Sequence, residues 1–271
     1  MDSSELLSLR FNPDADLLAA TLDCEAEVFL RAYGNTRQQL QDEYGPYEQA
    51  SVFIALADSG GDVLGACRLI RPSEAGLKSL HDAGRPPWSL DVARAVRAAR
   101  LDVSRTWDVA TLGCRRGLKG AGKLASAALF HALVQVVRAN EISSAVMVID
   151  ERVRKLLAAA GMTGRTLPGA VPASYLGSPA STPVYRHCDE AFDQQRITNP
   201  DAHRLYTQGI GLDGIAVPAL SEFRFRERAA SPQDGSRCRP STGSESNPPS
   251  DTVVRSRIQV STSAAGIGLA T

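Results

Sequence analysis

The sequence lacks the signals of several protein classes. No apolar run reaches the roughly 18 residues that a membrane-spanning helix requires. The first residues, Met1-Asp2-Ser3-Ser4-Glu5, have neither the basic region nor the hydrophobic stretch of an export signal. Net charge is also missing, because 30 basic and 30 acidic residues cancel, so no overall field attracts nucleic acid or an anionic membrane. We therefore expect a cytoplasmic protein with no membrane span and no nucleic-acid partner.

Disulfide, metal and nucleotide motifs are missing as well. The five cysteines are scattered without a C-x-x-C pair, and their odd number argues against a disulfide framework. The four histidines show no ligand spacing and H-E-x-x-H is absent, so we predict no metal site. Neither a G-x-S-x-G elbow nor a Walker loop is present, which argues against the hydrolases and NTPases that depend on them.

The sequence does contain enough apolar material for a core, with 43% hydrophobic residues in 271. Composition changes near residue 229. From Ser231 to Ser250 the chain is rich in Ser, Pro and Gly and has almost no apolar residues. Such a segment buries too little surface to offset the entropy lost on ordering. We predict one folded domain over residues 1–228 and a disordered, low-complexity tail over residues 229–271.

Hydrophobic periodicity predicts the elements of the folded domain. Apolar spacings of three and four residues indicate helices, and short apolar runs between turn residues indicate strands. Residues 107–149 form a pattern of strand, glycine-rich loop, helix and strand, which is typical of a βαβ unit with a parallel crossover. The whole order predicts a mixed-sheet α/β layer architecture. The predicted helices are 15–32, 91–100, 124–139 and 151–160, and the predicted strands are 51–57, 63–70, 107–112, 145–149 and about 183–187.

The loop of this βαβ unit is basic and rich in glycine. It reads Arg115-Arg116-Gly117-Leu118-Lys119-Gly120-Ala121-Gly122-Lys123. Its glycines allow a ligand to approach the backbone closely, and the free N–H groups at the start of the following helix attract anions. The loop is therefore a candidate diphosphate site. A mobile, solvated turn, or a loop kept for packing alone, is the alternative interpretation.

The order of elements, with this loop before the longest helix, resembles the GNAT superfamily of N-acyltransferases. In that family, backbone amides of the turn Gln/Arg-x-x-Gly-x-Gly/Ala hold the pyrophosphate of coenzyme A or of a phosphopantetheine carrier. This chain matches the last two fixed positions and has Gly117 where the family has Gln or Arg. The resemblance implies a three-layer α/β/α acyl-CoA N-acyltransferase fold and a coenzyme A thioester or phosphopantetheine carrier as co-substrate. It assigns to the donor Leu112, Arg116, Gly117, Lys119, Gly120, Ala121, Gly122 and Lys123.

Upstream segments resemble the acyl-homoserine-lactone (autoinducer) synthases and the related N-acyl amino acid synthases. In that group an arginine, acidic residues of an early loop and a G-x-x-R-L strand shape the acceptor side. The resemblance implies that Arg31, Glu43 and Arg68 bind the acceptor. On the fourth strand the synthases have Glu-x-Ser-Arg, where this chain has Asp108-Val109-Ala110-Thr111. The resemblance covers about residues 15–190, and the segments that carry it are Val28-Phe29-Leu30-Arg31, Asp42-Glu43-Tyr44, residues 51–56 and residues 63–70.

Direct acyl transfer to an amine needs a neutral amine, a carbonyl held next to it and an acid for the departing thiolate. Asp108 is the candidate base, provided that burial raises its pKa, and a solvated or salt-bridged aspartate is the alternative. Tyr175 is the candidate acid, in a proline-rich stretch that forms either a lid or an ordinary connection. Tyr185 competes for this role, and either tyrosine could simply pack. Arg68 needs a partner on its apolar strand, and Glu43 is the simplest one, in a structural ion pair or an acceptor site.

These residues predict an N-acyltransferase that moves an acyl group from an acyl-CoA or acyl-carrier-protein thioester to a small-molecule amine by direct attack. An acyl carrier protein is the expected partner if the donor is not acyl-CoA. The rival interpretation is a non-catalytic GNAT-like module that binds acyl-CoA or another ligand. Ala110 and Thr111, which stand where the synthases have Ser and Arg, favour this rival.

Overall fold

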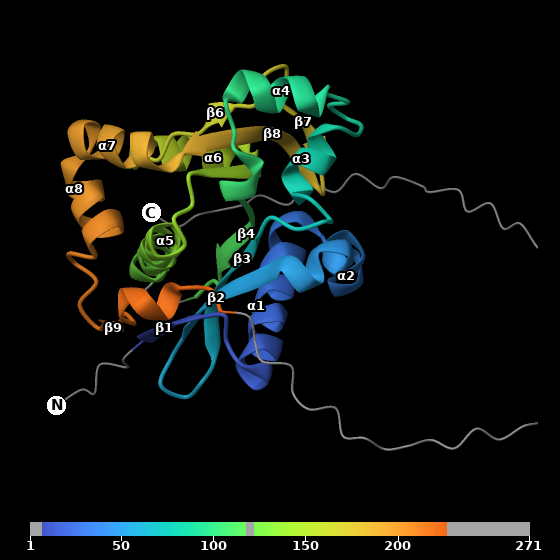
Figure 1. The fold of residues 1–271 in the computed structure, drawn as a ribbon. Coiled ribbons are helices and arrows are strands. Elements are labelled where there is room, and N and C mark those ends of the chain that lie inside the picture. Colours follow the sequence, from blue (N-terminus) through green and yellow to red (C-terminus); the bar gives the residue numbers. More distant parts are fainter. Residues whose placement is uncertain (1–6, 118–121, 227–271) are drawn as a thin grey trace, which may run out of the picture. The chain divides into compact units, whose positions relative to one another are not determined.

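The computed structural model describes residues 7–117 and 122–226 (Figure 1). The chain divides into two units, Met1–Phe225 and Arg226–Thr271. The predicted tail, 229–271, lies outside the described residues, and so do residues 118–121 of the glycine-rich loop. No helix in the described part of the chain is long and apolar enough to cross a membrane. Residues 7–117 and 122–226 also contain no group of three His, Cys, Asp or Glu side chains placed to hold a metal ion.

The first unit is built on one mixed sheet of nine strands in the order β6-β8-β5-β4-β3-β2-β1-β9, with β7 also paired to β8. The pairs β4–β5 and β1–β9 are parallel, and the other pairs are antiparallel. The predicted mixed-sheet α/β architecture and its parallel crossover are confirmed. The strands are β1 (Leu7–Phe11), β2 (Ser51–Ala57), β3 (Val63–Ile70), β4 (Thr106–Cys114), β5 (Ser144–Asp150), β6 (Arg165–Thr166), β7 (Ala173–Tyr175), β8 (Ser178–His187) and β9 (Ile215–Ala216).

Helices cover both faces of the sheet. On one face α5 packs through Ala125 and Leu129 against the centre of the sheet, and on the other α1 packs through Cys24. Successive side chains of a strand point to opposite faces of the sheet. Trp107 belongs to the core under α5, and the next residue, Asp108, accepts a hydrogen bond from α3. Therefore α3, and α4 that packs with it, lie on the same face of the sheet as α1. The helices are α1 (Ala15–Tyr33), α2 (Arg37–Tyr44), α3 (Lys78–Ala83), α4 (Val92–Ala99), α5 (Gly122–Ala139), α6 (Glu151–Ala159), α7 (Cys188–Thr198) and α8 (Pro200–Ala202), with shorter turns η1 (Gly45–Ala50), η2 (Val103–Arg105), η3 (His203–Thr207) and η4 (Leu220–Phe223).

The strongest sequence patterns became elements close to the predicted bounds. The hairpin strands span residues 51–57 and 63–70 as predicted, and the predicted helices correspond to α1, α4, α5 and α6. In α1 the Asp14 side chain accepts a bond from the N–H of Leu17, and Gly34 ends the helix at φ 76°. The elements that were not predicted include β1, α2, α3, α7 and β9, all of them short or polar.

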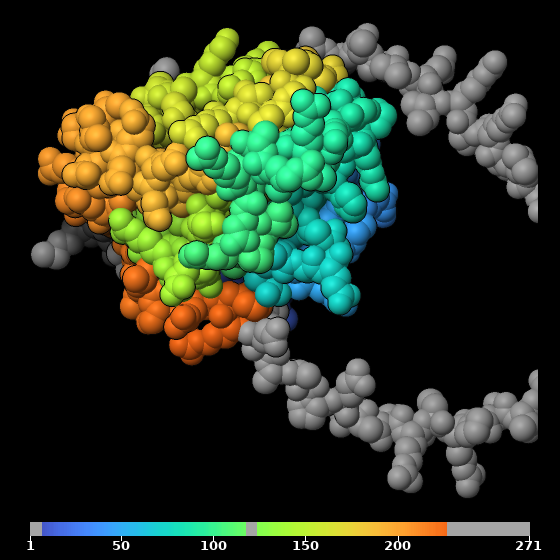
Figure 2. Space-filling model, turned by 45° about the horizontal axis from the view of Figure 1, so that its top comes forward, coloured from blue at the N-terminus to red at the C-terminus, as the bar shows by residue number. Residues whose placement is uncertain are grey.

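The proline-rich stretch 167–177 packs onto the layer of α3 and α4. Figure 2 shows it, in yellow, lying beside the blue-green segment of those helices. Leu167 is buried among the side chains of α3 and α4, and the indole Nε1 of Trp88 donates to the carbonyl of Val171 at 2.8 Å. The stretch is therefore held against the fold before it leads into β7.

Two neighbouring strands of the sheet separate at its centre. β4 and β5 pair in parallel only where Thr106, Trp107 and Asp108 meet residues 144–146. The register between β3 and β4 then shifts at Ala110, which is an extra residue in β4. β5 remains paired to β8 along its whole length. The result is an opening between β4 and β5, and this opening positions the candidate site.

Candidate functional site

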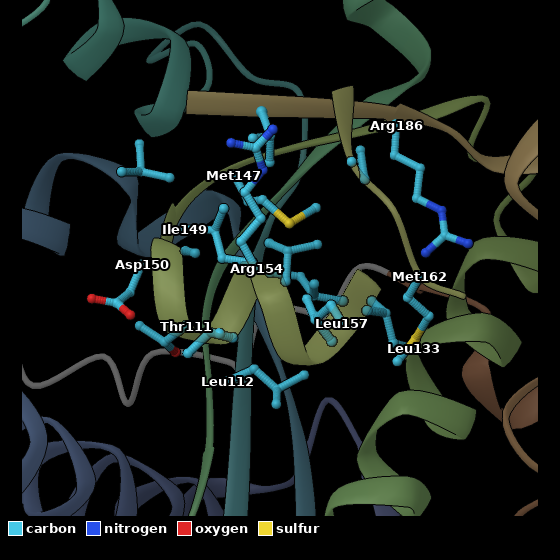
Figure 3. A pocket seen from close by; sticks show the side chains of 18 of the residues that line it. Thr111, Leu112, Leu133, Met147, Ile149, Asp150, Arg154, Leu157, Met162 and Arg186 are labelled. Carbon is cyan, nitrogen blue, oxygen red and sulfur yellow. The ribbon is translucent and has the colours of Figure 1, made fainter. Parts of the chain in front are cut away.

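A cavity of about 220 Å³ lies where β4 and β5 separate. Figure 3 looks into it, with Leu112 of β4, Met147 and Ile149 of β5, and Leu157 of α6 around it. α5 contributes a further wall through Leu133. Because most of the lining is apolar and only a few polar groups converge on it, the cavity has the character of a small-molecule site.

The backbone edges of the two separated strands face this opening. Val109, Thr111 and Leu112 of β4 pair with β3 on their other edge, and residues 147–150 of β5 pair with β8 on theirs. Toward each other these two stretches make no strand pairs in the described structure. Their N–H and C=O groups can therefore bind an extended ligand that lies between them. The hydroxyl of Tyr44 donates to the carbonyl of Ala110 at 3.3 Å, at the extra residue of β4.

Tyr175 lines the cavity and belongs to a buried polar cluster. Its hydroxyl donates to Oδ2 of Asp82 at 2.5 Å and accepts from Nζ of Lys78 at 2.9 Å. Lys78 also forms ion pairs with Asp82 at 2.7 Å and with Glu43 at 2.8 Å. Burial and then the Asp82 carboxylate raise the pKa of Tyr175 well above its usual value. The phenol therefore keeps its proton at neutral pH.

Asp108 is buried on the α3 side of β4. Its oxygens accept from the backbone N–H of Ser79 at 2.5 Å and from the Ser79 hydroxyl at 2.8 Å. Burial raises the pKa of Asp108 from 3.8 to about 6. Its side chain is not among those that line the cavity. The contacts place Asp108 at the start of α3, next to Lys78.

The expected ion pair between Glu43 and Arg68 is not formed. Arg68 instead bonds to Glu25 through Nε at 3.0 Å and Nη2 at 2.7 Å, and to Glu48 at 3.1 Å. The rings of Tyr44 and Phe53 lie 4.5 and 4.6 Å from its guanidinium carbon. Glu43 is on α2 and reaches Lys78 rather than β3. The buried carboxylate that pairs with Arg68 is therefore that of Glu25, on α1.

Glu25 is the centre of this second polar group. Only 3% of Glu25 and 3% of Arg68 is exposed. The Thr111 hydroxyl donates to Glu25 at 2.6 Å and accepts from the Arg68 backbone N–H at 3.2 Å. The carboxylate of Glu25 is thus shared by a cation and a hydroxyl, which is how a buried charge is stabilised.

The remaining predicted residues lie at the rim of the site or outside the described residues. Leu112 lines the cavity. Arg116 and Gly117 are exposed after the end of β4, and Gly117 has φ 83°. Arg31 is exposed in the last turn of α1. The predicted positions Lys119, Gly120 and Ala121 lie outside the described residues, while Gly122 and Lys123 are the first residues of α5.

Sequence reasoning did not find Lys78, Asp82, Glu25 or Arg186, which lines the cavity from β8. Lys78 and Asp82 are four residues apart, a spacing that places them on one side of a helix, but α3 has only six residues. Glu25 and Arg186 each interrupt an otherwise apolar pattern. A charged residue within an apolar pattern is rarely buried without a partner, and this feature of the sequence could have identified both residues as candidates.

No protein family model and no curated protein sequence matches the chain. Among solved structures, FeeM, an N-acyl amino acid synthase from uncultured soil microbes, matches with a TM-score of 0.52 at 11% identity, over 72% of this chain and 96% of that chain. The AHL synthase LasI matches with a TM-score of 0.47 at 14% identity, over 68% and 91% of the two chains. BjaI, a CoA-dependent acyl-homoserine lactone synthase solved with SAM and isopentyl-CoA, has a TM-score of 0.45 at 13% identity, over 81% and 97%. The chain has the GNAT fold that its sequence resemblance implied.

Proposed function

We propose that the chain is an N-acyltransferase that moves an acyl group from a thioester to the amine of a small molecule. The observation that carries this proposal is the apolar cavity between β4 and β5, with Tyr175 on its wall. The amine nitrogen attacks the thioester carbonyl, the C–N bond forms and the C–S bond breaks. The amine loses one proton, and the departing thiolate takes up one proton to become a thiol.

The donor is an acyl-CoA or an acyl-carrier-protein thioester. Its acyl chain fits the cavity, because the walls there are formed by side chains such as Leu112 and Met147. The amides of its pantetheine arm find backbone partners on the facing edges of β4 and β5. The loop between Cys114 and Gly122, which leads into the N-terminus of α5, suits the donor phosphates.

Tyr175 is proposed as the acid that protonates the thiolate. Its hydroxyl lies on the cavity wall and accepts a hydrogen bond from Nζ of Lys78, whose positive charge would stabilise the phenolate left after proton donation. Lys78 donates to the hydroxyl and Asp82 accepts from it, and these two hydrogen bonds hold it in place. Lys78 in turn contacts Glu43, whose side chain is 38% exposed and can attract an ammonium group of the acceptor.

We propose a positioning role for Asp108 instead of direct contact with the amine. Asp108 fixes Ser79, and Ser79 follows Lys78 in the chain. We also propose a positioning role for Arg68, because its guanidinium is enclosed by Glu25, Glu48 and Tyr44 and acts on the site through these residues. If Arg68→Ala folds and leaves acceptor affinity unchanged, Arg68 has no part in acceptor binding.

The test is thiol release by the purified protein from short- and long-chain acyl-CoA and acyl-carrier-protein donors with a panel of amines, with calorimetry of donor binding in parallel. We expect Tyr175→Phe to lower kcat roughly 100-fold, because general acid catalysis contributes about that factor, and to leave donor affinity within about threefold. Tyr185→Phe is the matched control, since Tyr185 faces the α3–α4 core, and should retain activity.

The outcomes separate two functions. Donor binding without thiol release for every amine would replace the enzyme with a ligand-binding module of the same fold. Absence of both binding and release would overturn the proposal. Equal loss of activity in the Tyr175 and Tyr185 variants would remove Tyr175 from the chemistry.

A further inference from the structure

Arg186 is a cation on the wall of an otherwise largely apolar cavity. It lies on β8 opposite Ala145 of β5, and both residues line the cavity. Figure 3 shows its side chain extending from the strand toward the part of the cavity formed by Met162 and Leu133. A guanidinium in this position is surrounded mainly by carbon, which is unfavourable unless an anion or hydrogen-bond acceptor compensates it.

No such group is present in the described structure. Nε of Arg186 is buried without a hydrogen-bond partner, and no ion pair is formed by its guanidinium within residues 7–117 and 122–226. Burial lowers the pKa of Arg186. The Phe192 ring centre lies 5.9 Å from the guanidinium carbon of Arg186 and equally far from that of Arg138, so this ring is shared by two cations and supplies no anion. Glu190 on α7 is already paired with Arg165.

The other cation on the cavity wall is not in the same situation. Arg154 of α6 pairs with Glu151 at 3.1 Å and donates to the Thr166 hydroxyl at 3.0 Å. Its charge is therefore compensated within the fold. Of these two cations, only Arg186 has a buried donor nitrogen without a hydrogen-bond partner in the described part of the chain.

Arg186 and Tyr175 lie toward opposite ends of the cavity. Ser181 pairs with Asp150 at the end of β5, and Tyr175 pairs with Ser178 beyond it. On β8, Arg186 lies five residues after Ser181 and eight residues after Ser178, lengths of about 17 Å and about 27 Å at the rise of an extended strand. A chain whose thioester lies near Tyr175 would therefore have its far end near Arg186.

We propose that the cavity binds acyl groups that end in a carboxylate, so that the donor is a monothioester of a dicarboxylic acid and Arg186 holds its free carboxylate. This inference rests on the proposed acyl transfer for the position of the thioester. The planar fork of a guanidinium matches a carboxylate with two parallel hydrogen bonds, and the apolar walls fit the methylene chain between the two ends. An acceptor bound near Glu43 lies on the Tyr175 side and cannot supply this carboxylate.

The test compares three CoA thioesters of equal length, which end in a methyl group, a carboxamide or a carboxylate. Decanoyl-CoA and the two decanedioyl derivatives are suitable probes, with dissociation constants from calorimetry and kcat/KM from thiol release. We expect the wild-type protein to bind the carboxylate donor roughly 10- to 100-fold more tightly than the other two, as for a charge-assisted hydrogen bond. Free decanedioic acid should compete more weakly than its thioester.

Arg186→Gln should remove this preference and change the affinity for decanoyl-CoA by less than about threefold. Arg165→Gln is the matched control, because Arg165 lies on β6 with its side chain 65% exposed, and it should keep the wild-type ratio. Arg186→Lys keeps the charge without the fork and should retain part of the preference. Circular dichroism checks that each variant is folded.

The wild-type comparison stands even if an Arg186 variant fails to fold. Equal affinity for the three donors would overturn the inference, and so would an unchanged ratio in folded Arg186→Gln, or binding of the free diacid but not of its thioester. Turnover of decanoyl-CoA without a carboxylate preference removes the inference and keeps the transferase. A carboxylate preference without turnover keeps the binding inference and removes the transferase.

Discussion

Asp108 is a carboxylic acid that the fold has removed from water, with none of its side chain exposed. Burial raises its pKa from 3.8 to about 6, whereas the unfolded chain keeps the ordinary value. Below about pH 3 both states carry the proton, and the stability linked to this proton is fully present. It is lost as the pH rises toward about 6, because the unfolded state ionises first.

Asp108→Asn removes this titration and keeps an oxygen that can accept from Ser79. We expect the difference in free energy of unfolding between variant and wild type to change by about 2 kcal/mol in favour of the variant from pH 4 to pH 7. Urea denaturation at four pH values measures it, and the other carboxylates cancel in the difference. A difference that does not depend on pH would contradict the raised pKa.

The residues of the site differ in how far sequence alone could place them. Asp108 could be singled out because it stands in a strand that enters the glycine-rich loop. The partner of Arg68 could not be found in this way, because Glu25 is 43 residues away on a helix whose exposed and buried sides had to be guessed. A buried arginine needs an anionic partner, so the sequence predicts that Arg68 is paired. Which carboxylate pairs with it depends on how α1 lies on β3, and the sequence does not show this.

At the scale of elements, the β7–β8 turn is fixed against the end of α1. Gly177 adopts φ 81°, and a Cβ at this position would overlap the carbonyl oxygen of Tyr33. Tyr175, which lines the cavity, is two residues before Gly177. The close contact of Gly177 with the end of α1 therefore helps to position Tyr175. Gly214 has a similar φ of 86° with no heavy atom within 4 Å of such a Cβ.

These two glycines form a matched pair for a test. Gly214→Ala should cost about 1–2 kcal/mol of stability, the strain of a left-handed alanine. Gly177→Ala should cost more, because the backbone of Tyr33 must also move, and should reduce thiol release by displacing Tyr175. Chemical denaturation and the thiol assay measure both effects. Equal costs with full activity would show that the contact with α1 does not position Tyr175.

Sequence patterns predicted an element well when it was long and when its apolar residues were clearly set off from polar neighbours. The hairpin 51–57 and 63–70 was predicted to its ends because both strands are apolar and the turn between them is polar. α3 escaped prediction because six residues carry too little periodicity, although it supplies Lys78 and Asp82. The opening between β4 and β5 also left no pattern, since it arises from a single extra residue, Ala110, and from pairing partners far apart in the chain.

At the scale of the whole molecule, the first unit ends at Phe225. Phe223 is fully buried, and its carbonyl accepts from the Asn140 side chain at 2.8 Å. The Asn140 oxygen in turn accepts from the N–H of Phe225 at 2.8 Å. These contacts bind η4 to α5 and to the core that includes Leu9. Residues up to 225 therefore belong to the fold.

Two truncated chains test where the fold ends. A chain of residues 1–226 should melt within about 2 °C of the full chain and bind acyl-CoA equally well, because the composition of the tail predicts no buried surface. A chain of residues 1–219 lacks Phe223 and should be less stable by about 3–5 kcal/mol, the cost of removing a core phenylalanine. Calorimetric melting with and without donor measures both. If the 1–226 chain lost donor binding while keeping its melting temperature, residues 227–271 would contribute to the site rather than to stability.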